Sequence, residues 1–319
     1  MKIFITGATG FLGSKIIEQF QDKYSLSILV RNKDLLSKLK EKNITSHYGD
    51  LSTIQTEMLN EIDTVIHTAA LARPYGKWED FYHSNVEGTK NLLEKSIAAN
   101  VKKFIYISTE AVCFQGKDLI EIDERINVLQ YQKYDYAYSK MLAEKAVIEA
   151  GSDNFLTISL RPSWIWGPGD TNALPMMIDM VKQNKFMWVD QGKARKTTTY
   201  IYNLIDAIEA SLHLLETRKI YFINDGEYRS LKNFLTPLLA TQGVSIPEKS
   251  VPGWLIRTVG KIAELSWRLG GRKGRPAGTR LEADFMSSEI LIKNDLARQE
   301  LNWKPRFSID EGILEVGKI

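Results

Sequence analysis

The chain has very little cysteine. Cys113 is the only thiol among 319 residues, so no internal disulfide can form, and we expect a reducing compartment, the cytoplasm. Histidine is also scarce, and none of the four histidines has the spacing of metal ligands, so we expect structural roles and no bound metal. These histidines are His47, His67, His83 and His213. The net charge of +3 is too small to indicate a nucleic-acid partner.

Long apolar runs are absent as well. No stretch of about 18 apolar residues occurs, so we predict no membrane span. The apolar run at Lys2–Thr6 is too short for a signal peptide. A composition of 44% hydrophobic and 25% charged residues is that of an ordinary globular protein, with one large domain or two.

Short apolar runs alternate with helical patterns through the first half of the chain. The expected strands are 2–6, 26–30, 44–48, 64–67, 104–108 and 155–160. The expected helices are 11–20, 35–42, 85–99 and 136–150. This alternation predicts an α/β fold with a Rossmann-type, doubly wound parallel sheet over 1–165, and a ligand at the carboxyl ends of its strands.

The alternation breaks after Arg161, where prolines and glycines punctuate the sequence. We expect 166–319 to form mainly a smaller C-terminal cap that binds substrate. Some segments of this half, at about 196–224, should return to the dinucleotide-binding domain. The apolar run at 219–224 is the strand that we expect to rejoin the sheet.

A glycine loop, Thr6-Gly7-Ala8-Thr9-Gly10-Phe11-Leu12-Gly13, follows the first expected strand and opens a helix. Glycines let the backbone approach a pyrophosphate, and a helix N-terminus offers free N–H groups to it. The spacing is Gly-x-x-Gly-x-x-Gly, which differs from the Gly-x-Gly-x-x-Gly of standard dinucleotide dehydrogenases. The loop therefore predicts a bound dinucleotide.

The end of the second strand bears on the choice between NAD and NADP. NAD binders usually place a carboxylate there, whereas a guanidinium can pair with the 2′-phosphate of NADP. Here the residue is Arg31, with Lys33 close by. We favour NADP(H), with NAD(H) as the alternative if these two residues only form a solvated turn. Asp50 and Leu51, after the third strand, are placed to contact the adenine.

Tyr136 and Lys140 lie four residues apart in an expected helix, so both point the same way. A tyrosine with its ordinary pKa near ~10 is a poor base at neutral pH. A neighbouring ammonium group favours the phenolate and is expected to lower the pKa of Tyr136 into a useful acid/base range. After a dinucleotide loop, this pair indicates hydride-transfer chemistry.

Three stretches together resemble the extended short-chain dehydrogenase/reductase family over nearly the whole chain. They are Thr6–Gly13, Tyr136-x-x-x-Lys140 and Arg161-Pro-Ser-Trp-Ile-Trp-Gly-Pro-Gly-Asp170. Within that family the chain looks most like the 3β-hydroxysteroid dehydrogenase branch and the similar reductases of long-chain 3-oxo acids. The closer likeness is carried by Trp166–Asp170, Tyr221–Gly226 and Asn302–Pro305.

The resemblance implies a catalytic set of Thr109, Tyr136 and Lys140. Thr109 would orient the substrate oxygen, and Tyr136 would exchange a proton with it. Lys140 would lower the pKa of Tyr136 and bind the nicotinamide ribose. The implied cofactor-binding residues are Thr6, Gly7, Thr9, Gly10, Phe11, Leu12, Gly13, Arg31, Asp50, Leu51, Ala69, Ala70, Asn85, Ser108, Lys140 and Pro162. Asn85 also has an ordinary interpretation, that of a helix N-cap.

The substrate is less clearly indicated. Trp164, Trp166 and Trp188, with several methionines, could line a pocket for a sterol or acyl chain, or could equally be core. The segment 251–275 reads as an amphipathic helix with a basic tail, either a lid over the substrate or a peripheral membrane contact, and we favour the lid. The resemblance suggests a homodimer packed through the helices of Asn85 and Tyr136.

Two other functions remain open. One is a nucleotide-sugar epimerase or reductase, because Arg195 or Lys196 could replace the arginine that binds pyrophosphate in such enzymes. Dehydration is disfavoured, since Thr109 is followed by Glu110 and then alanine, without the second carboxylate of the dehydratases. The other is a non-catalytic NADP sensor, which would have no need of a tyrosine–lysine pair.

Overall fold

The computed structural model describes residues 1–33, 44–126, 128, 131–269 and 279–318. Its centre is a seven-stranded sheet in which every pair of neighbours is parallel. In spatial order the strands are β11 (Lys219–Ile223), β7 (Leu156–Pro162), β5 (Lys103–Ile107), β4 (Thr64–His67), β1 (Lys2–Thr6), β2 (Ser25–Val30) and β3 (Thr45–Tyr48). The order reverses between β1 and β4, which is where such sheets bind nucleotides.

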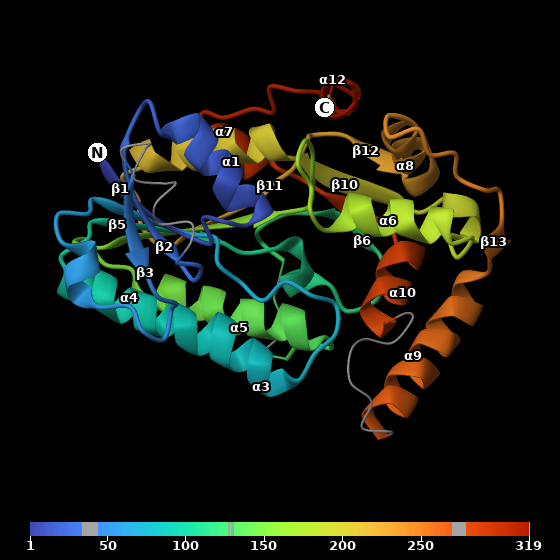
Figure 1. The fold of residues 1–319 in the computed structure, drawn as a ribbon, viewed down its shortest axis with the longest axis horizontal. Helices are drawn as coiled ribbons and strands as arrows, with labels where there is room; N and C mark the ends of the chain where they lie inside the picture. The colour runs from blue at the N-terminus through green and yellow to red at the C-terminus, as the bar shows by residue number, and fades with distance from the viewer. Residues whose placement is uncertain (34–43, 127, 129–130, 270–278, 319) are drawn as a thin grey trace.

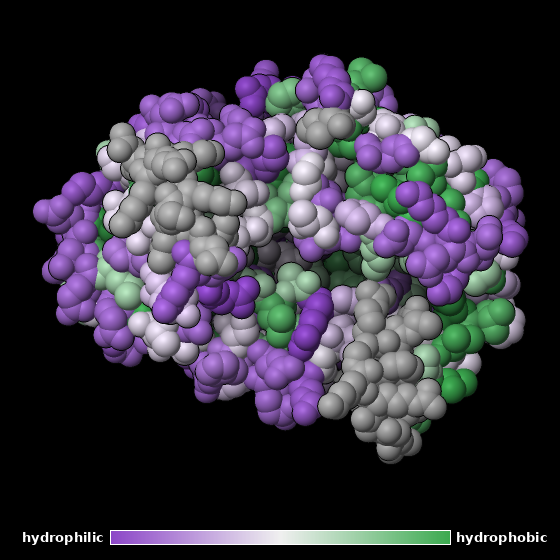
Figure 2. All heavy atoms as spheres, in the orientation of Figure 1, coloured by the Kyte–Doolittle hydropathy of each residue, from purple (hydrophilic) through white to green (hydrophobic). Residues whose placement is uncertain are grey.

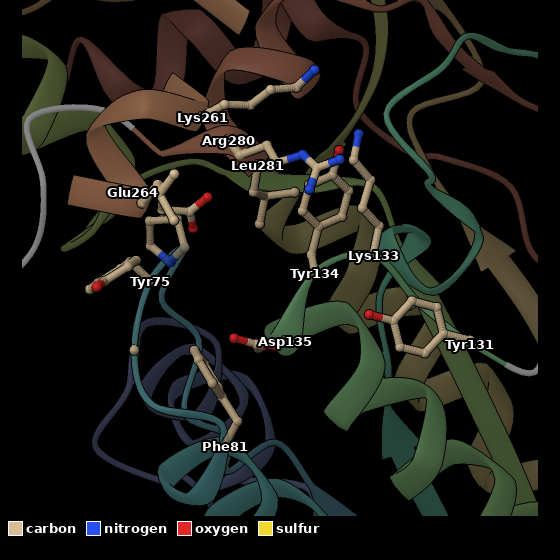
Figure 3. A pocket seen from close by; sticks show the side chains of 13 residues that line it. Tyr75, Phe81, Tyr131, Lys133, Tyr134, Asp135, Lys261, Glu264, Arg280 and Leu281 are labelled. Atoms are coloured by element: carbon tan, nitrogen blue, oxygen red, sulfur yellow. The ribbon is translucent and has the colours of Figure 1, made fainter. Parts of the chain in front are cut away.

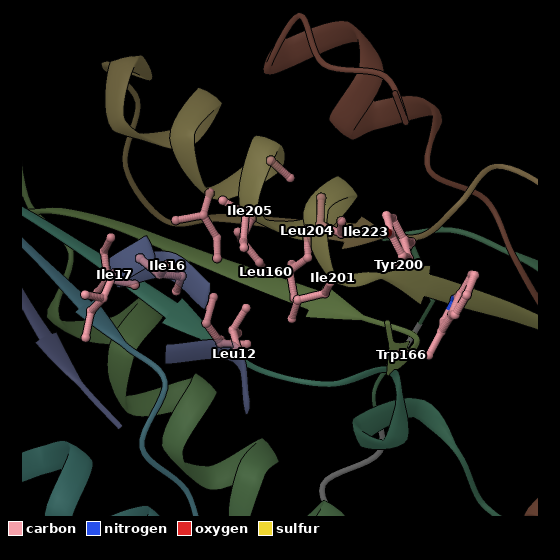
Figure 4. Packing of buried hydrophobic residues seen from close by; sticks show 14 of the residues in the cluster. Leu12, Ile16, Ile17, Leu160, Trp166, Tyr200, Ile201, Leu204, Ile205 and Ile223 are labelled. Carbon is pink, nitrogen blue, oxygen red and sulfur yellow. The ribbon is translucent and has the colours of Figure 1, made fainter. Parts of the chain in front are cut away.

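Helices cover both faces of this sheet (Figure 1). α1 (Phe11–Phe20) and α7 (Ile201–His213) pack on one face, and α4 (Gly88–Ala98) and α5 (Asp135–Ala150) on the other. Figure 4 shows Leu12 and Ile16 of α1 facing Leu160 of β7 and Leu204 of α7 in one buried cluster. Burial of these apolar faces stabilises the arrangement and fixes the carboxyl edge of the sheet.

A second region adjoins that edge. Its five-stranded sheet contains β6 (Leu119–Ile122), β8 (Trp164–Trp166), β10 (Arg195–Tyr200), β12 (Tyr228–Ser230) and β14 (Ile290–Ile292). A small pair joins β9 (Trp188–Val189) to β13 (Ser250–Val251). The helices here are α6 (Ala173–Lys182), α8 (Leu231–Ala240), α9 (Gly253–Leu269), α10 (Arg280–Ser287), α11 (Asp295–Glu300) and α12 (Ile309–Val316).

The expected fold class is confirmed, and the strand expected at 219–224 does rejoin the sheet as β11. One exchange was not foreseen: β6 comes from the first half of the chain but pairs with β14 in the second sheet. The helix predicted at 35–42 lies outside the described residues. Among the helices that are described, none combines the length and apolar character needed to cross a membrane.

The helix predicted to begin at Asn85 begins earlier. α3 (Trp78–Phe81) continues through a π-helical turn, η2 (Tyr82–Glu87), into α4. Asn85 lies inside that turn, so its interpretation as an N-cap is wrong. The turn inserts its extra residue beside the nucleotide edge, a common place for such bulges.

Candidate active site

The glycine loop folds tightly between β1 and α1. Gly7 has φ of +75°, and a Cβ there would lie 2.5 Å from Thr68 Oγ1. A Cβ on Gly13 would lie 2.1 Å from the carbonyl oxygen of Gly7. No side chain caps the N-terminus of α1 at Gly10, while Thr9 and Gly10 are exposed. The first N–H groups of α1 are thus available to an anion, and the cradle fits a dinucleotide pyrophosphate.

A buried hydrogen-bond chain supports this loop from below. Thr6 Oγ1 is 2.6 Å from His67 Nδ1, and His67 Nε2 is 2.9 Å from Thr89 Oγ1. Burial and the nearby Lys140 charge lower the pKa of His67 to about 3, so the ring is neutral. His67 therefore has the structural role that we expected, although its place behind the nucleotide loop was not foreseen. A histidine ending a strand beside the glycine loop was the available signal.

The residues predicted to contact adenosine lie at the carboxyl ends of β2 and β3. Arg31 is exposed directly after β2, and Lys33 Nζ lies 4.7 Å from the centre of the Tyr48 ring. Asp50 Oδ1 accepts hydrogen bonds from its own turn, including one of 2.9 Å from the Ser52 N–H, and these hold the pKa of the carboxyl below its usual value.

Asn85 connects the nucleotide edge to the helix of Tyr136. Its Oδ1 accepts from the Leu71 N–H at 2.6 Å, and its Nδ2 donates to Ser139 Oγ at 2.9 Å. Ser139 Oγ in turn donates to the carbonyl of Tyr136 at 2.8 Å. Asn85 thereby fixes the loop that contains Ala69 and Ala70 relative to α5. The remaining predicted contacts, which are Phe11, Leu12, Leu51, Ser108 and Pro162, border the same edge.

Thr109 and Tyr136 come together. Thr109 follows β5, and its Oγ1 accepts from the Ala111 N–H at 3.2 Å, capping the short turn η3 (Glu110–Cys113). Burial raises the pKa of Tyr136 to about 12, an effect reduced by the Thr109 hydroxyl and reinforced by the charge of Glu110. The expected lowering is absent from the protein alone, because burial is the largest effect on this pKa and Lys140 is not among the groups that shift it.

Lys140 points toward the sheet. Its Nζ donates to the carbonyl of Ile107 at 2.7 Å and lies 4.2 Å from the centre of the Tyr106 ring. Burial lowers the pKa of this ammonium to about 7, while Glu144 raises it. Ile107 supplies the one hydrogen-bond acceptor of this Nζ among the described residues, so the lysine, one helical turn from Tyr136, can also donate to a ribose hydroxyl.

A buried ion pair lies one turn further along α5. Arg161 Nη2 is 2.6 Å from Glu144 Oε1, and Ser159 Oγ donates to Glu144 Oε2 at 2.8 Å. Although burial raises the pKa of Glu144, the Arg161 guanidinium holds it below the usual value. Sequence reasoning missed this pair. The sequence placed Glu144 four residues after Lys140, hence on the same helix face, but nothing in it marked Arg161 as the partner of that glutamate.

The three predicted substrate tryptophans differ in exposure. Trp166 and Trp188 are each 1% exposed, and Trp166 Nε1 donates to Asp225 Oδ2 at 3.1 Å within the core. Trp164 is partly exposed and packs edge-on against Phe234 and Phe285. The burial of Trp166 and Trp188 favours the alternative that they are core. Of the three tryptophans, Trp164 alone has an exposed surface that a substrate could contact.

A cavity of about 280 Å³ opens between α9, α10 and the start of α5. Figure 3 shows Phe81, Asp135 and Leu281 around its opening, with Lys261 and Glu264 supplied by α9. The Phe81 ring centre is 6.4 Å from that of Tyr136, so one of the residues that line the cavity packs beside the tyrosine. Figure 2 shows this face of the molecule hollowed near its centre, between the nucleotide sheet and the second region.

The glycine loop opens α1 at the point where the strand order of the parallel sheet reverses, and Tyr136 and Lys140 stand at the same edge. Acid/base groups beside a dinucleotide cradle define an NAD(P)-dependent dehydrogenase or reductase that acts on hydroxyl and keto groups. The model of the 3-beta hydroxysteroid dehydrogenase/isomerase family matches residues 4–252. The chain belongs to that family, which confirms the resemblance drawn from the sequence.

Individual relatives cover almost the entire chain. A 4-hydroxy-2-methyl-3-oxo-4-farnesyl-3,4-dihydroquinoline-1-oxide ketoreductase from Stigmatella aurantiaca is 29% identical over 98% of this chain and 95% of its own length. A 2-alkyl-3-oxoalkanoate reductase from Stenotrophomonas maltophilia (strain K279a) is 28% identical over 98% and 97%. The solved structure of a UDP-glucuronic acid 4-epimerase from Bacillus cereus with NAD shares the fold, with a TM-score of 0.77, 19% identity and 100% and 98% coverage.

Proposed function

We propose that the protein transfers hydride between NADP(H) and the hydroxyl or ketone carbon of a bulky apolar substrate, steroid-like or long-chain 3-oxoacyl. The meeting of the Thr109 and Tyr136 hydroxyls beside the glycine cradle carries this proposal. When bound, the nicotinamide supplies or accepts the hydride. Thr109 orients the substrate oxygen, and Tyr136, kept protonated by its raised pKa, donates its proton to that oxygen during reduction.

The two relatives support an apolar ketone as substrate. One name describes a farnesylated ring ketone, and the other a 2-alkyl-3-oxoalkanoate. In both names a second oxygen function stands close to the ketone, a 4-hydroxyl in one and the carboxylate of a 3-oxo acid in the other. Assay of steroid and 3-oxoacyl ketones against sugar nucleotides tests the proposal: oxidation of NADPH by the sugar nucleotides alone would contradict it.

The surroundings of Arg195 and Lys196 weigh against a nucleotide-sugar substrate. Arg195 pairs with Glu289, with 2.6 Å between Nε and Oε1. Lys196 is 1% exposed, and its Nζ donates to the carbonyls of Phe285 and Ser288. Neither cation is available to the pyrophosphate of a sugar nucleotide without losing these partners.

We propose that Arg31 selects NADP(H). Arg31→Ala should raise the Kd for NADPH by about 10- to 100-fold, because a charge-assisted pairing with the 2′-phosphate is worth about 1.5–3 kcal/mol. The Kd for NADH should stay within about threefold, as measured by fluorescence titration. Lys102→Ala, an exposed lysine directly before β5 and away from the carboxyl edge of the sheet, is the matched control for loss of surface charge. Tighter binding of NADH than of NADPH by the unaltered protein would overturn this preference.

We also propose that α9 is a lid over the cavity. Lys261, Glu264 and Leu265 of this helix line the cavity, while Trp254 is 70% exposed and Ile262 62% exposed. The basic tail beyond α9 lies outside the described residues. Because a charge at the cavity wall disfavours an apolar chain, Leu265→Asp should raise KM for a long-chain ketone at least about tenfold, with Ile262→Asp as control.

Vesicles distinguish the lid from the peripheral membrane contact. In cosedimentation with vesicles containing anionic phosphatidylglycerol, the protein should stay in the supernatant. Sedimentation that Trp254→Ser or Ile262→Asp abolishes would instead establish α9 as a surface-binding helix, since those two are the most exposed apolar side chains described on this helix.

A homodimer formed through the helices that carry Asn85 and Tyr136 remains part of the proposal, as does a cytoplasmic location. Figure 1 shows α4 and α5 side by side on the outer face of the sheet, which suits packing against a second copy. The buried, unpaired Cys113 suits a reducing compartment.

A further inference from the structure

Glu110 occupies an unusual place beside the catalytic pair. It is the first residue of η3, directly after Thr109, and only 4% of its surface is exposed. One of its carboxylate oxygens, Oε2, is buried without any hydrogen-bond partner among the described residues. Its charge is close enough to Tyr136 to influence the pKa of that phenol. The Glu110 carboxyl therefore belongs to the surroundings of the reacting centre.

Three titratable groups surround this carboxyl. Tyr136 faces it from α5, Lys196 from β10, and Cys113 from its own turn. The Ser163 hydroxyl and the Trp164 backbone N–H also approach it. Lys196 is already bonded to two backbone carbonyls. Lys196 thus attracts the Glu110 carboxylate electrostatically, but Oε2 has no hydrogen-bond donor among the described residues.

Burial raises the pKa of Glu110 to about 7, against the effects of Ser163, Lys196 and the Trp164 N–H. Both the protonated and the ionised forms are therefore available near neutral pH. The protonated form donates a hydrogen bond to a substrate oxygen, and the ionised form accepts one from a substrate hydroxyl. Glu110 can therefore bind either a substrate acceptor or a substrate hydroxyl, and only its protonation state needs to change.

A buried polar atom without a partner destabilises a fold, and native proteins rarely keep one without a use. We infer that Glu110 binds a second oxygen function of the substrate, a hydroxyl or carboxylate on a carbon next to the reacting ketone. This inference rests on the proposed function, because Thr109 and Tyr136 must hold the ketone oxygen beside Glu110. Glu110 then determines specificity, while the proton exchange stays with Tyr136.

Three chain-matched ketones test the inference: a long-chain ketone, its 2-hydroxy derivative, and the corresponding 3-oxo acid, freshly prepared because such acids lose CO₂. A site built to hydrogen-bond a substrate group can reject the analogue that lacks it by up to about 10⁴–10⁵. The ratio of kcat/KM for one oxygenated ketone to that for the plain ketone should be at least about 100 by the same reasoning.

Glu110→Met keeps the length of the side chain but removes its hydrogen bonds, so this ratio should fall to within about threefold of one. Glu94→Gln, an exposed glutamate on α4, is the control and should leave it unchanged. NADPH binding and the circular-dichroism spectrum verify folding. A ratio near one in the unaltered enzyme, or an equal ratio in Glu110→Met, overturns the inference. Failure of every ketone to be reduced would instead refute the proposed function.

The pH dependence of the ratio separates the two oxygen functions and covers the case in which Glu110→Met does not fold. Titration of Tyr136, Lys196 and Cys113 is common to the compared substrates and largely cancels in the ratio. For the 3-oxo acid the ratio should fall as pH rises through about 7, because ionised Glu110 repels the carboxylate. For the hydroxyketone it should rise. Glu110→Gln cannot ionise, so its ratios should be flat; a pH dependence retained in that variant excludes Glu110 as the ligand.

Discussion

Replacing Tyr136 with phenylalanine should lower kcat for ketone reduction by about 10²–10⁴-fold, the usual contribution of a positioned general acid. The Kd for NADPH should remain within about threefold, because the cofactor cradle is built from the glycine loop and Lys140 rather than from the phenol. Burial raises the pKa of this phenol to about 12, so it carries its proton throughout the neutral range. Steady-state kinetics and fluorescence titration measure the two quantities.

Tyr138→Phe is the matched control for this variant. Tyr138 lies on the same helix, and its ring stacks on Trp78 with 5.1 Å between centres. Loss of its hydroxyl should leave kcat within about twofold, as expected for a group away from the reaction. Full activity of Tyr136→Phe, or equal losses in both variants, would contradict the assignment of Tyr136 as the acid.

Arg161→Met should destabilise the fold by about 3–5 kcal/mol, because it leaves the Glu144 carboxylate buried and unpaired. Both side chains are almost fully buried, with 4% and 5% of their surfaces exposed, so solvent cannot replace the lost guanidinium. Denaturant unfolding measures the free energy of unfolding. A loss below about 1 kcal/mol would mean that the pair acts as an exposed ion pair does.

The double variant Glu144→Leu/Arg161→Met is the control, and it should recover most of this stability because no buried charge remains. The pH dependence of the free energy of unfolding provides a second test of the ion pair. In the unaltered protein the pKa of Glu144 is depressed, so its contribution to stability is present above the unfolded-state pKa and is lost as pH falls through the folded-state value. Without Arg161 that pKa should rise, and the deficit of Arg161→Met should shrink toward acidic pH.

The sequence predicted the sheet and its cofactor edge because those features depend on local patterns. Alternating apolar runs place β1, β4 and β5, and the glycines of the loop are required by contacts as close as that of Gly13 with the Gly7 carbonyl. The spacing of Tyr136 and Lys140 likewise follows from helix geometry alone.

Features that depend on distant parts of the chain could not be predicted. A glutamate on a helix and an arginine on a strand, Glu144 and Arg161, carry no mark in the sequence that they meet. Nor does the pattern of Trp166 and Trp188 distinguish a pocket wall from a core, since both bury apolar surface. The predicted lowering of the Tyr136 pKa was wrong for the same reason. Helix spacing indicates the neighbouring Lys140, but the depth to which Tyr136 is buried depends on the tertiary structure.

The path of the chain between Cys113 and Tyr136 has a mechanical consequence. It leaves the turn that carries Glu110, adds β6 to the second sheet beside β14, and returns to begin α5. In exchange, β11 from the second half completes the edge of the first sheet next to β7. Each half thus lends the other a strand, so neither should fold alone, and unfolding should be a single cooperative event. The segment from Thr109 to Tyr136 carries a catalytic hydroxyl at each end and contains β6 between them. A shift of the second sheet as substrate enters would therefore be transmitted to both hydroxyls.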